Sequence, residues 1–170
     1  MQYAEILEWL RKEYLGVRSG QANPAILDAV KVEVYGSPMA VSQLATITVG
    51  DPRMLRIVPW DKSVITAIDT AIRQSNLGVS VVADGEGLRI AFPQLTADSR
   101  QTLMKIAKQK LEEARIKIRN ERQKTLDDIE RKNAGEDESK RAKNELQKSV
   151  DEANKKLEEL YQKKESELLK

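Results

Sequence analysis

Apolar residues near the start of the chain recur every three or four positions, which is the repeat of an amphipathic helix. The stripe consists of Tyr3, Ile6, Leu7, Leu10, Tyr14 and Val17. Such a helix is stable only when its apolar face packs against other apolar surface. Residues 18–24 have the sequence RSGQANP. Gly20 favours a helix end, and Pro24 biases the backbone of Asn23 towards extended conformations, so we predict that the helix ends in this segment.

From Val30 onward the repeat shortens to two, which is the repeat of β-strands. The candidate strands are VKVEVYG, ATITVGDP, MLRIVP, LGVSVVADGEG and LRIAF. We expect the first of them to end at a Gly-Ser-Pro turn. Residues 60–75 have a helical repeat instead, and Asp61 is the predicted cap of that helix. The pattern therefore predicts a small β-rich α/β domain over residues 28–93.

The rest of the chain returns to a helical repeat. Thr96 is the predicted cap, and the apolar seam that follows consists of Leu103, Ala107, Leu111, Ala114, Ile118, Leu126 and Ile129. The sequence Asn-Ala-Gly at 133–135 interrupts it. A last helix carries Ala142, Leu146, Val150, Ala153, Leu157, Leu160 and Leu168. These two long helices predict a hairpin with a free apolar groove.

The first helix has an apolar face and no neighbour in sequence to cover it, so we expect it to pack into that groove. The predicted fold is α+β: a three-helix bundle, residues 1–23 and 96–170, interrupted by an inserted small β-rich α/β sandwich domain, residues 28–93. Two chain crossings, residues 18–27 and 92–96, would then form a hinge.

Composition narrows the function classes. The 170 residues include no Cys and no His, which excludes disulfides, thiolate catalysis, thiolate zinc sites and the commonest general base. No other catalytic constellation is visible, so we expect no enzyme activity, no cofactor and no metal site. The first residues are neither a signal nor a transit peptide by pattern, and no apolar run has the length of a membrane span. We therefore expect a cytoplasmic protein that has no contact with a membrane.

Charge is unevenly distributed along the chain. The net charge is only +2, yet residues 100–124 contain nine Lys or Arg and three Asp or Glu. A local excess of this kind indicates a helix that faces a polyanion, or else a solvated helix face.

Several stretches are also characteristic of a known family. They are RSGQANPAILDAVKVEVYGSPMAVSQLA, MLRIVPWDKS, AIRQSNLGV, LRIAFPQLT, EEARIKIRNER and KKESEL. In this order and at these intervals, the chain resembles the bacterial ribosome recycling factors along almost its whole length.

The resemblance implies an L-shaped monomer with the dimensions of transfer RNA. It implies binding to the ribosome left on messenger RNA after termination, and separation of the subunits together with elongation factor G, whose GTP hydrolysis helps to drive the step. The factor itself would catalyse no reaction. Without the resemblance, the same pattern would also suit a coiled-coil interaction module or a holdase-type helical protein with no RNA role.

Three arginines are the main candidates for RNA contact. Arg115, Arg119 and Arg122 are spaced by four and three residues, so they share one helix face. The resemblance places Arg119 and Arg122 in the RNxR core that faces large-subunit ribosomal RNA, and Arg100 at a further basic position. Arginine suits this task because its planar fork binds two phosphate oxygens. The alternative is that these arginines pair with Glu112, Glu113 or Glu121 of the same helix.

The hinge candidates are Arg18, Gly20, Asn23 and Pro24 on the first crossing and Pro93 on the second. For Arg18 the alternative role is to cap the carbonyl groups at the end of the first helix.

The chain also departs from the family pattern. Gln21, Ser99 and Gln123 stand where basic residues are usual, and Ala91 and Gln94 stand where prolines are usual. The first helix is shorter by about three turns, which predicts a hairpin tip without a third partner.

Two aromatic residues of the inserted domain have open roles. Tyr35 and Trp60 could stack on nucleobases, but we expect them to pack in the core.

Overall fold

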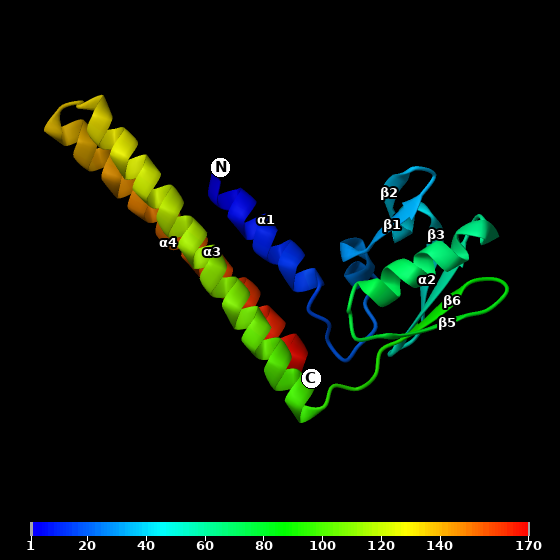
Figure 1. Ribbon diagram of the computed structural model, residues 1–170. Helices are drawn as coiled ribbons and strands as arrows, with labels where there is room; N and C mark the ends of the chain where they lie inside the picture. Colours follow the sequence, from blue (N-terminus) through cyan, green and yellow to red (C-terminus); the bar gives the residue numbers. More distant parts are fainter. Residues whose placement is uncertain (1, 170) are drawn as a thin grey trace. The chain divides into compact units, whose positions relative to one another are not determined.

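The computed structural model describes residues 2–169, which divide into two compact units. One unit comprises residues 104–166 together with the described residues up to Glu13. The other comprises residues 14–103 and the described residues from Glu167 onward. Each unit is described by itself (Figure 1).

The first unit is helical. It contains most of α1 (Gln2–Leu15), α3 (Ala97–Lys132) and α4 (Glu136–Leu169), whose remaining end residues are assigned to the second unit. Figure 1 shows α3 and α4 as a long antiparallel pair with α1 alongside. The predicted apolar seam is buried along its middle, at Ile6, Leu10, Ala107, Leu111, Ala114, Ile118, Leu146, Val150, Ala153 and Leu157. Towards the hairpin tip the seam loosens, because Leu126 and Ile129 are only half-buried.

Local sequence signals set most helix ends. The backbone N–H of Ser99 donates to the hydroxyl oxygen of Thr96 at 3.0 Å, which confirms Thr96 as the cap of α3. Asn133 has a φ of 45°, a left-handed conformation that ends a helix, and α4 begins three residues later. The end of α1 differs from the prediction. This helix stops at Leu15, before Gly20, because a tight turn from the N–H of Val17 to the carbonyl of Tyr14 replaces the next helical turn.

The second unit contains a four-stranded antiparallel sheet in the order β3-β4-β6-β5. The strands are β3 (Ala45–Asp51), β4 (Met54–Pro59), β5 (Ser80–Ala83) and β6 (Leu88–Ala91). Alternate residues of the central strands, Leu55, Ile57, Leu88 and Ile90, are buried on one face. Helix α2 (Ile65–Gln74) contributes Ile68 and Ile72 to the same core. Seventeen buried aliphatic and aromatic residues form this core, and Phe92 is its aromatic member.

One strand was not predicted. Strand β1 (Lys31–Val34) pairs with β2 (Ser37–Ala40), so the expected Gly-Ser-Pro turn is wrong. The turn instead consists of Tyr35 and Gly36, with φ angles of 53° and 77°. Two consecutive positive φ angles make a two-residue hairpin turn whose twist matches that of the strands it joins, and Ser37 is already paired with Val34.

Three short 3-10 helices complete the unit: η1 (Pro24–Ala29), η2 (Val41–Gln43) and η3 (Lys62–Val64). Asp61 precedes η3 and accepts a hydrogen bond from the Ser63 N–H at 2.9 Å. The predicted cap is therefore confirmed, although it caps the short helix that leads into α2.

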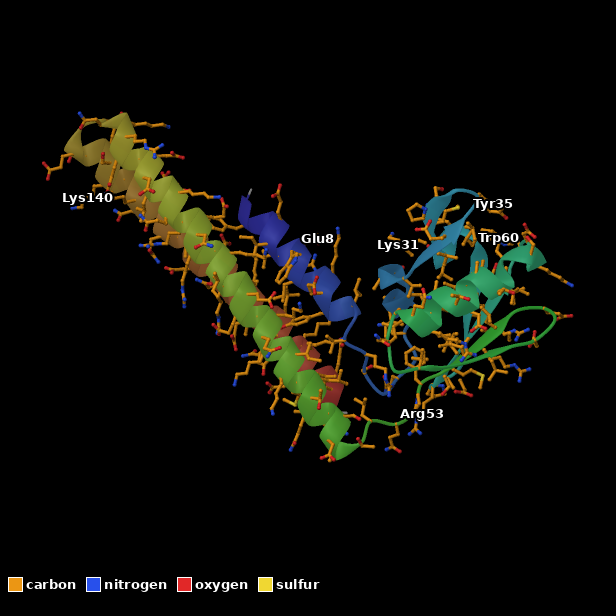
Figure 2. All side chains as sticks on the ribbon, viewed as in Figure 1. Glu8, Lys31, Tyr35, Arg53, Trp60 and Lys140 are labelled. Carbon is orange, nitrogen blue, oxygen red and sulfur yellow. The ribbon has the colours of Figure 1, made fainter. Side chains whose placement is uncertain are left out.

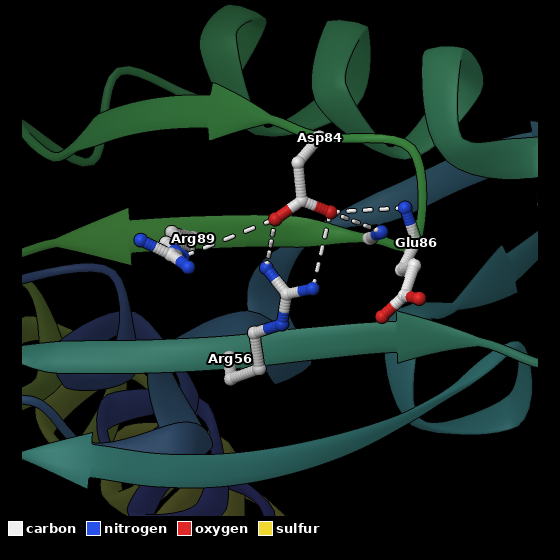
Figure 3. A network of polar contacts seen from close by, with 5 residues as sticks. Arg56, Asp84, Glu86 and Arg89 are labelled. Carbon is white, nitrogen blue, oxygen red and sulfur yellow. Dashed lines mark hydrogen bonds and ion pairs between the residues drawn. The ribbon is translucent and has the colours of Figure 1, made fainter.

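A carboxylate organises the turn between β5 and β6 (Figure 3). Asp84 accepts two hydrogen bonds from the Arg56 guanidinium, at 2.5 and 3.1 Å, and one each from the backbone N–H groups of Glu86 and Gly87 at 2.9 Å. These bonds, led by the one from Arg56, hold the pKa of the Asp84 carboxyl far below its usual range. Gly87 must be glycine, because a Cβ would lie 2.1 Å from the carbonyl oxygen of Ile57.

The expected core packing of Tyr35 and Trp60 is wrong. Their exposed fractions are 68 % and 69 %. Tyr35 lies on the hairpin turn, and Trp60 follows Pro59, which is the last buried residue of β4, so the alternation of the strand turns the indole outward.

Among the helices in the described part of the chain, none combines the length and the apolarity needed to cross a bilayer.

Candidate nucleic-acid interface

Helix α3 presents the candidate arginines on one continuous helical face. Arg115, Arg119 and Arg122 fall within the first unit and lie between buried seam positions and solvent. Arg119 is exposed, whereas Arg115 and Arg122 are half-buried. The predicted juxtaposition therefore exists, but the three side chains differ in what already binds them.

Arg115 is engaged by two carboxylates. Its guanidinium contacts the Glu112 carboxylate at 2.6 Å and the Glu158 carboxylate of α4 at 2.8 Å. The sequence-based alternative of pairing with Glu112 is thus confirmed, and a partner 43 residues away adds to it. Because its N–H groups already point at carboxylates, Arg115 must give up a partner before it can bind a phosphate with both arms.

Arg122 is engaged more weakly. Its Nε donates to the amide oxygen of Gln147 at 3.3 Å, and no ion pair holds the side chain among the described residues. This bond orients the guanidinium and leaves its terminal N–H groups available.

Arg119 makes no hydrogen bond or ion pair within the described residues, and the same holds for Lys105 and Lys108. Lys108 stands seven residues before Arg115 and eleven before Arg119, so these side chains repeat on one helix face. The sequence analysis did not predict these two lysines as RNA contacts, although their spacing from the arginines could have indicated them. We call Lys105, Lys108, Arg119 and Arg122 the open basic stripe.

The basic residues on the side of α3 that faces α1 are engaged within the unit. The ammonium groups of Lys117 and Lys110 lie 4.7 and 5.9 Å from the centre of the Trp9 ring, within the range of cation–π attraction. Lys110 also contacts the Glu13 carboxylate at 3.1 Å, and the hydrogen bond to Glu13 raises the pKa of Lys110. Much of the local positive excess on this side therefore stabilises the packing of α1.

Arg100 is separate from the other three arginines. It belongs to the second unit and lies fifteen residues before Arg115, about 22 Å along the helix axis. It is half-buried, and its Nε is buried with no hydrogen-bond partner among the described residues.

Arg18 does not cap the first helix. It is buried and donates to the carbonyl oxygens of Ser19 at 3.1 Å and Pro93 at 2.8 Å, so the alternative of capping carbonyl groups of the first helix is wrong. The bond to Pro93 joins the two segments that were predicted to form the hinge, both of which lie in the second unit. Burial lowers the pKa of Arg18, but an arginine stays charged in a protein.

The remaining hinge candidates lie close to this bond in sequence. The side chain of Asn23 accepts from the N–H of Ala25 at 3.0 Å and caps η1, which begins at Pro24. Gly20 has open space where a side chain would point. The described residues include no group of three or more acidic, His or Cys side chains arranged to hold a metal ion.

Comparison with known proteins gives consistent results for sequence and structure. Residues 10–169 match the model of the ribosome recycling factor family. The ribosome-recycling factor of Carboxydothermus hydrogenoformans is 47 % identical over 167 residues, covering 96 % of this chain and 90 % of that protein. The factor of Heliobacterium modesticaldum is 42 % identical with the same coverage.

Two solved structures share the fold. The solution structure of a ribosome recycling factor is 33 % identical, has a TM-score of 0.83 and covers 99 % of this chain and 91 % of its own. The Thermus thermophilus factor, placed with Escherichia coli elongation factor G on the E. coli post-termination complex, is 40 % identical, has a TM-score of 0.67 and covers 99 % and 94 %. The chain belongs to the ribosome recycling factor family.

Proposed function

We propose that this protein binds the post-termination ribosome and acts with elongation factor G to separate the subunits and release the messenger RNA. The observation that carries the proposal is the similarity over nearly the whole chain to proteins of this name, one of them placed with elongation factor G on the post-termination complex. GTP hydrolysis belongs to the partner, and this chain acts by binding and transmitting force rather than by catalysis.

The open basic stripe is the proposed contact with large-subunit ribosomal RNA. Arg119 is its centre, because it is exposed and unengaged, and Arg122 lies one turn further on with free terminal N–H groups. We assign Arg115 a secondary role, because Glu112 and Glu158 already bind its guanidinium. Arg100 is a second, separate contact with RNA.

The domain boundaries are part of the same proposal. Residues 1–23 and 96–170 form the RNA-binding arm, residues 28–93 form the inserted domain, and residues 18–27 and 92–96 form the hinge. Support comes from the Arg18 bond to Pro93, which links the two crossings. We further propose that the protein works in the cytoplasm as a monomer.

Sedimentation with purified large subunits tests the RNA contact. The wild-type protein should co-sediment at low salt and be released as the salt concentration rises, because phosphate contacts give a salt-dependent affinity. A protein that stays in the supernatant at low salt, or whose binding does not change with salt, would contradict the proposed function.

A further inference from the structure

Two side chains of α4 reach across the hairpin to arginines of α3. The amide oxygen of Gln147 accepts a hydrogen bond from the Nε of Arg122 at 3.3 Å, and a carboxylate oxygen of Glu158 accepts one from the guanidinium of Arg115 at 2.8 Å. All four residues belong to the first unit, where side chains project from both long helices along the whole hairpin (Figure 2). Each of the two arginines therefore has an acceptor on α4, but one acceptor is a neutral amide and the other is a carboxylate.

The contact with Arg122 orients the guanidinium without occupying it. Gln147 binds only Nε, so the two terminal nitrogens of Arg122 have no hydrogen bond among the described residues. The amide nitrogen of Gln147 donates to the carboxylate of Asp151, one turn further along α4, at 2.8 Å. This second bond fixes the amide with its oxygen towards Arg122, because the reversed amide would place its oxygen against the carboxylate. A guanidinium that is already oriented loses less conformational entropy when a phosphate binds.

The contact with Arg115 occupies the guanidinium instead. One terminal nitrogen contacts the carboxylate of Glu112 at 2.6 Å, and the other contacts the carboxylate of Glu158 at 2.8 Å. The two carboxylates bind the same nitrogens that a phosphate would bind, and they repel a phosphate that approaches. Arg115 can therefore contribute to RNA affinity only after an ion pair breaks.

The alternative role of these contacts is to hold the hairpin together. The side chains of Arg115, Glu112 and Glu158 are 35 %, 51 % and 42 % exposed, and ion pairs with this much solvent contribute little to stability. The buried apolar seam between α3 and α4 already joins the two helices. The contacts across the hairpin therefore matter more for the availability of the two guanidinium groups than for folding.

We propose that Gln147 and Glu158 are positioning residues that set how much Arg122 and Arg115 contribute to RNA binding. Gln147 keeps Arg122 ready for a phosphate, whereas Glu158 withholds Arg115. The inference rests on the proposed function, because it concerns the contact of α3 with large-subunit ribosomal RNA. It adds to that function a limit on affinity, which suits a factor that has to leave the ribosome once the subunits have separated.

Two full-length variants exchange the type of acceptor. Gln147→Glu gives Arg122 a carboxylate partner, and Glu158→Gln gives Arg115 an amide partner. A third variant combines both changes and keeps the net charge of the protein. Each change replaces an amide nitrogen by an oxygen or the reverse, so the volume of the side chain is nearly constant.

The matched controls make the same chemical changes elsewhere on α4. They are Gln162→Glu and Glu159→Gln, at two exposed positions whose side chains have no hydrogen bond or ion pair among the described residues. They report the effect of one charge on α4 that does not act through either arginine.

Sedimentation with purified large subunits at a fixed, low salt concentration measures the affinity. Gln147→Glu should weaken binding about three- to fivefold, because a phosphate must then displace an exposed ion pair from Arg122. Glu158→Gln should strengthen binding by up to a similar factor, since Glu112 still holds one arm of Arg115. The two controls should change the affinity less than the variant with the same chemical change.

Removing each arginine shows whether the effects pass through it. Gln147→Glu should have no further effect in an Arg122→Ala background, and Glu158→Gln should bring no gain in an Arg115→Ala background, because residues that act through each other are non-additive. In the combined variant, Arg115→Ala should cost more affinity than Arg122→Ala, the reverse of their order in the wild-type protein. Urea unfolding checks that every variant is folded.

Effects of equal size with and without the arginines would overturn the inference, because the changed charges would then act on the RNA directly. Unchanged binding in either Gln147→Glu or Glu158→Gln would also overturn it. In both cases co-sedimentation of the wild-type protein would leave the proposed function standing. A wild-type protein that does not co-sediment with large subunits would instead overturn the proposed function and this inference with it.

Discussion

At the scale of single residues, three arginines on one helix face differ in what already binds them. Arg115 is held by carboxylates from α3 and α4, Arg122 by an amide oxygen, and Arg119 by no group among the described residues. An unengaged guanidinium binds phosphate without first breaking a bond. Arg119 should therefore contribute most to ribosome binding and least to stability.

Changing Arg119 to Ala should weaken binding to large subunits. Removal of one arginine–phosphate interaction should lower the slope of log affinity against log salt by roughly 0.7 to 0.9. The free energy of unfolding should change by no more than about 0.5 kcal/mol, because the side chain is exposed and unpaired. Sedimentation over a salt series and urea unfolding measure the two effects.

Arg131→Ala is the matched control, since Arg131 is exposed on the same helix and should leave both the affinity and the slope unchanged. A large loss of stability with unchanged binding would show that Arg119 is structural instead.

A second prediction at this scale concerns Asp84. Changing it to Asn removes the charge that binds Arg56 and should lower the free energy of unfolding at neutral pH. The folded-state pKa of Asp84 is depressed, so its contribution is present above the unfolded value of about 3.9 and is lost as the pH falls through the lower folded value. The stability difference between wild type and variant should therefore shrink below about pH 4.

Urea unfolding of both proteins at several pH values measures this difference. Glu86→Gln is the control in the same loop, because only the backbone of Glu86 binds Asp84. A difference that stays constant down to the lowest pH at which both proteins fold would contradict an ionic role for Asp84.

At the scale of elements, the hairpin of α3 and α4 is unevenly covered. Ala107, Leu111, Ala114 and Ile118 are buried in the middle, whereas Leu126 and Ile129 nearer the tip are half-buried. Leu146 of α4 is only 8 % exposed, so the seam on this helix stays buried up to this residue. Helix α1 begins beside the middle of the hairpin and supplies no apolar face further out (Figure 1).

We predict that amide hydrogens near the tip, in residues 123–146, exchange faster than those in residues 107–118 and 150–157. Sparser apolar packing makes local opening less costly. Hydrogen exchange followed by mass spectrometry measures this at peptide resolution. Equal protection in the two regions would mean that another surface, such as a second copy of the chain, covers the tip.

At the scale of the whole molecule, the proposed hinge consists of two short chain crossings, residues 18–27 and 92–96, and short crossings allow rigid-body motion. Ala91 and Gln94 lie where prolines would restrict the second crossing. These two positions differ in their surroundings. Ala91 is in β6 and pairs with Met54 on one side and Ser80 on the other, so a proline there would remove an N–H inside the sheet. Gln94 follows β6 and is free of that constraint.

We predict a wide distribution of inter-domain distances, which Gln94→Pro should narrow. The chain has no native cysteine, so spin labels on cysteines that replace Lys62 and Lys140 would report the distribution directly. Affinity for large subunits should stay unchanged, because no arginine is altered, and Gln94→Ala is the control for loss of the amide. A distribution that is already narrow in the natural sequence would contradict the idea of a loose hinge.

The sequence by itself determined features that depend on neighbours a few residues apart. Helix caps and helix faces are formed by residues within one or two turns of each other, so they could be predicted. The correct predictions are the Thr96 cap, the Asp61 cap, the break at residues 133–135 and the buried seam of the long helices. The family could also be recognised from the sequence, because its motifs occur in a fixed order. Strand β2 could not be predicted in this way. Ser37 and Pro38 favour turns on their own, and only their pairing with β1 makes them part of a strand.

Only the tertiary structure decided which side chains are available for binding. Arg115 meets Glu158 and Arg122 meets Gln147 across two helices, and Arg18 meets Pro93 across 75 residues of chain. Tyr35 and Trp60 looked like core residues and are exposed. The contacts of the three arginines depend on which distant surfaces meet. The exposure of the two aromatic residues depends on where the hairpin turn falls and where β4 ends, which the pairing of the strands decides.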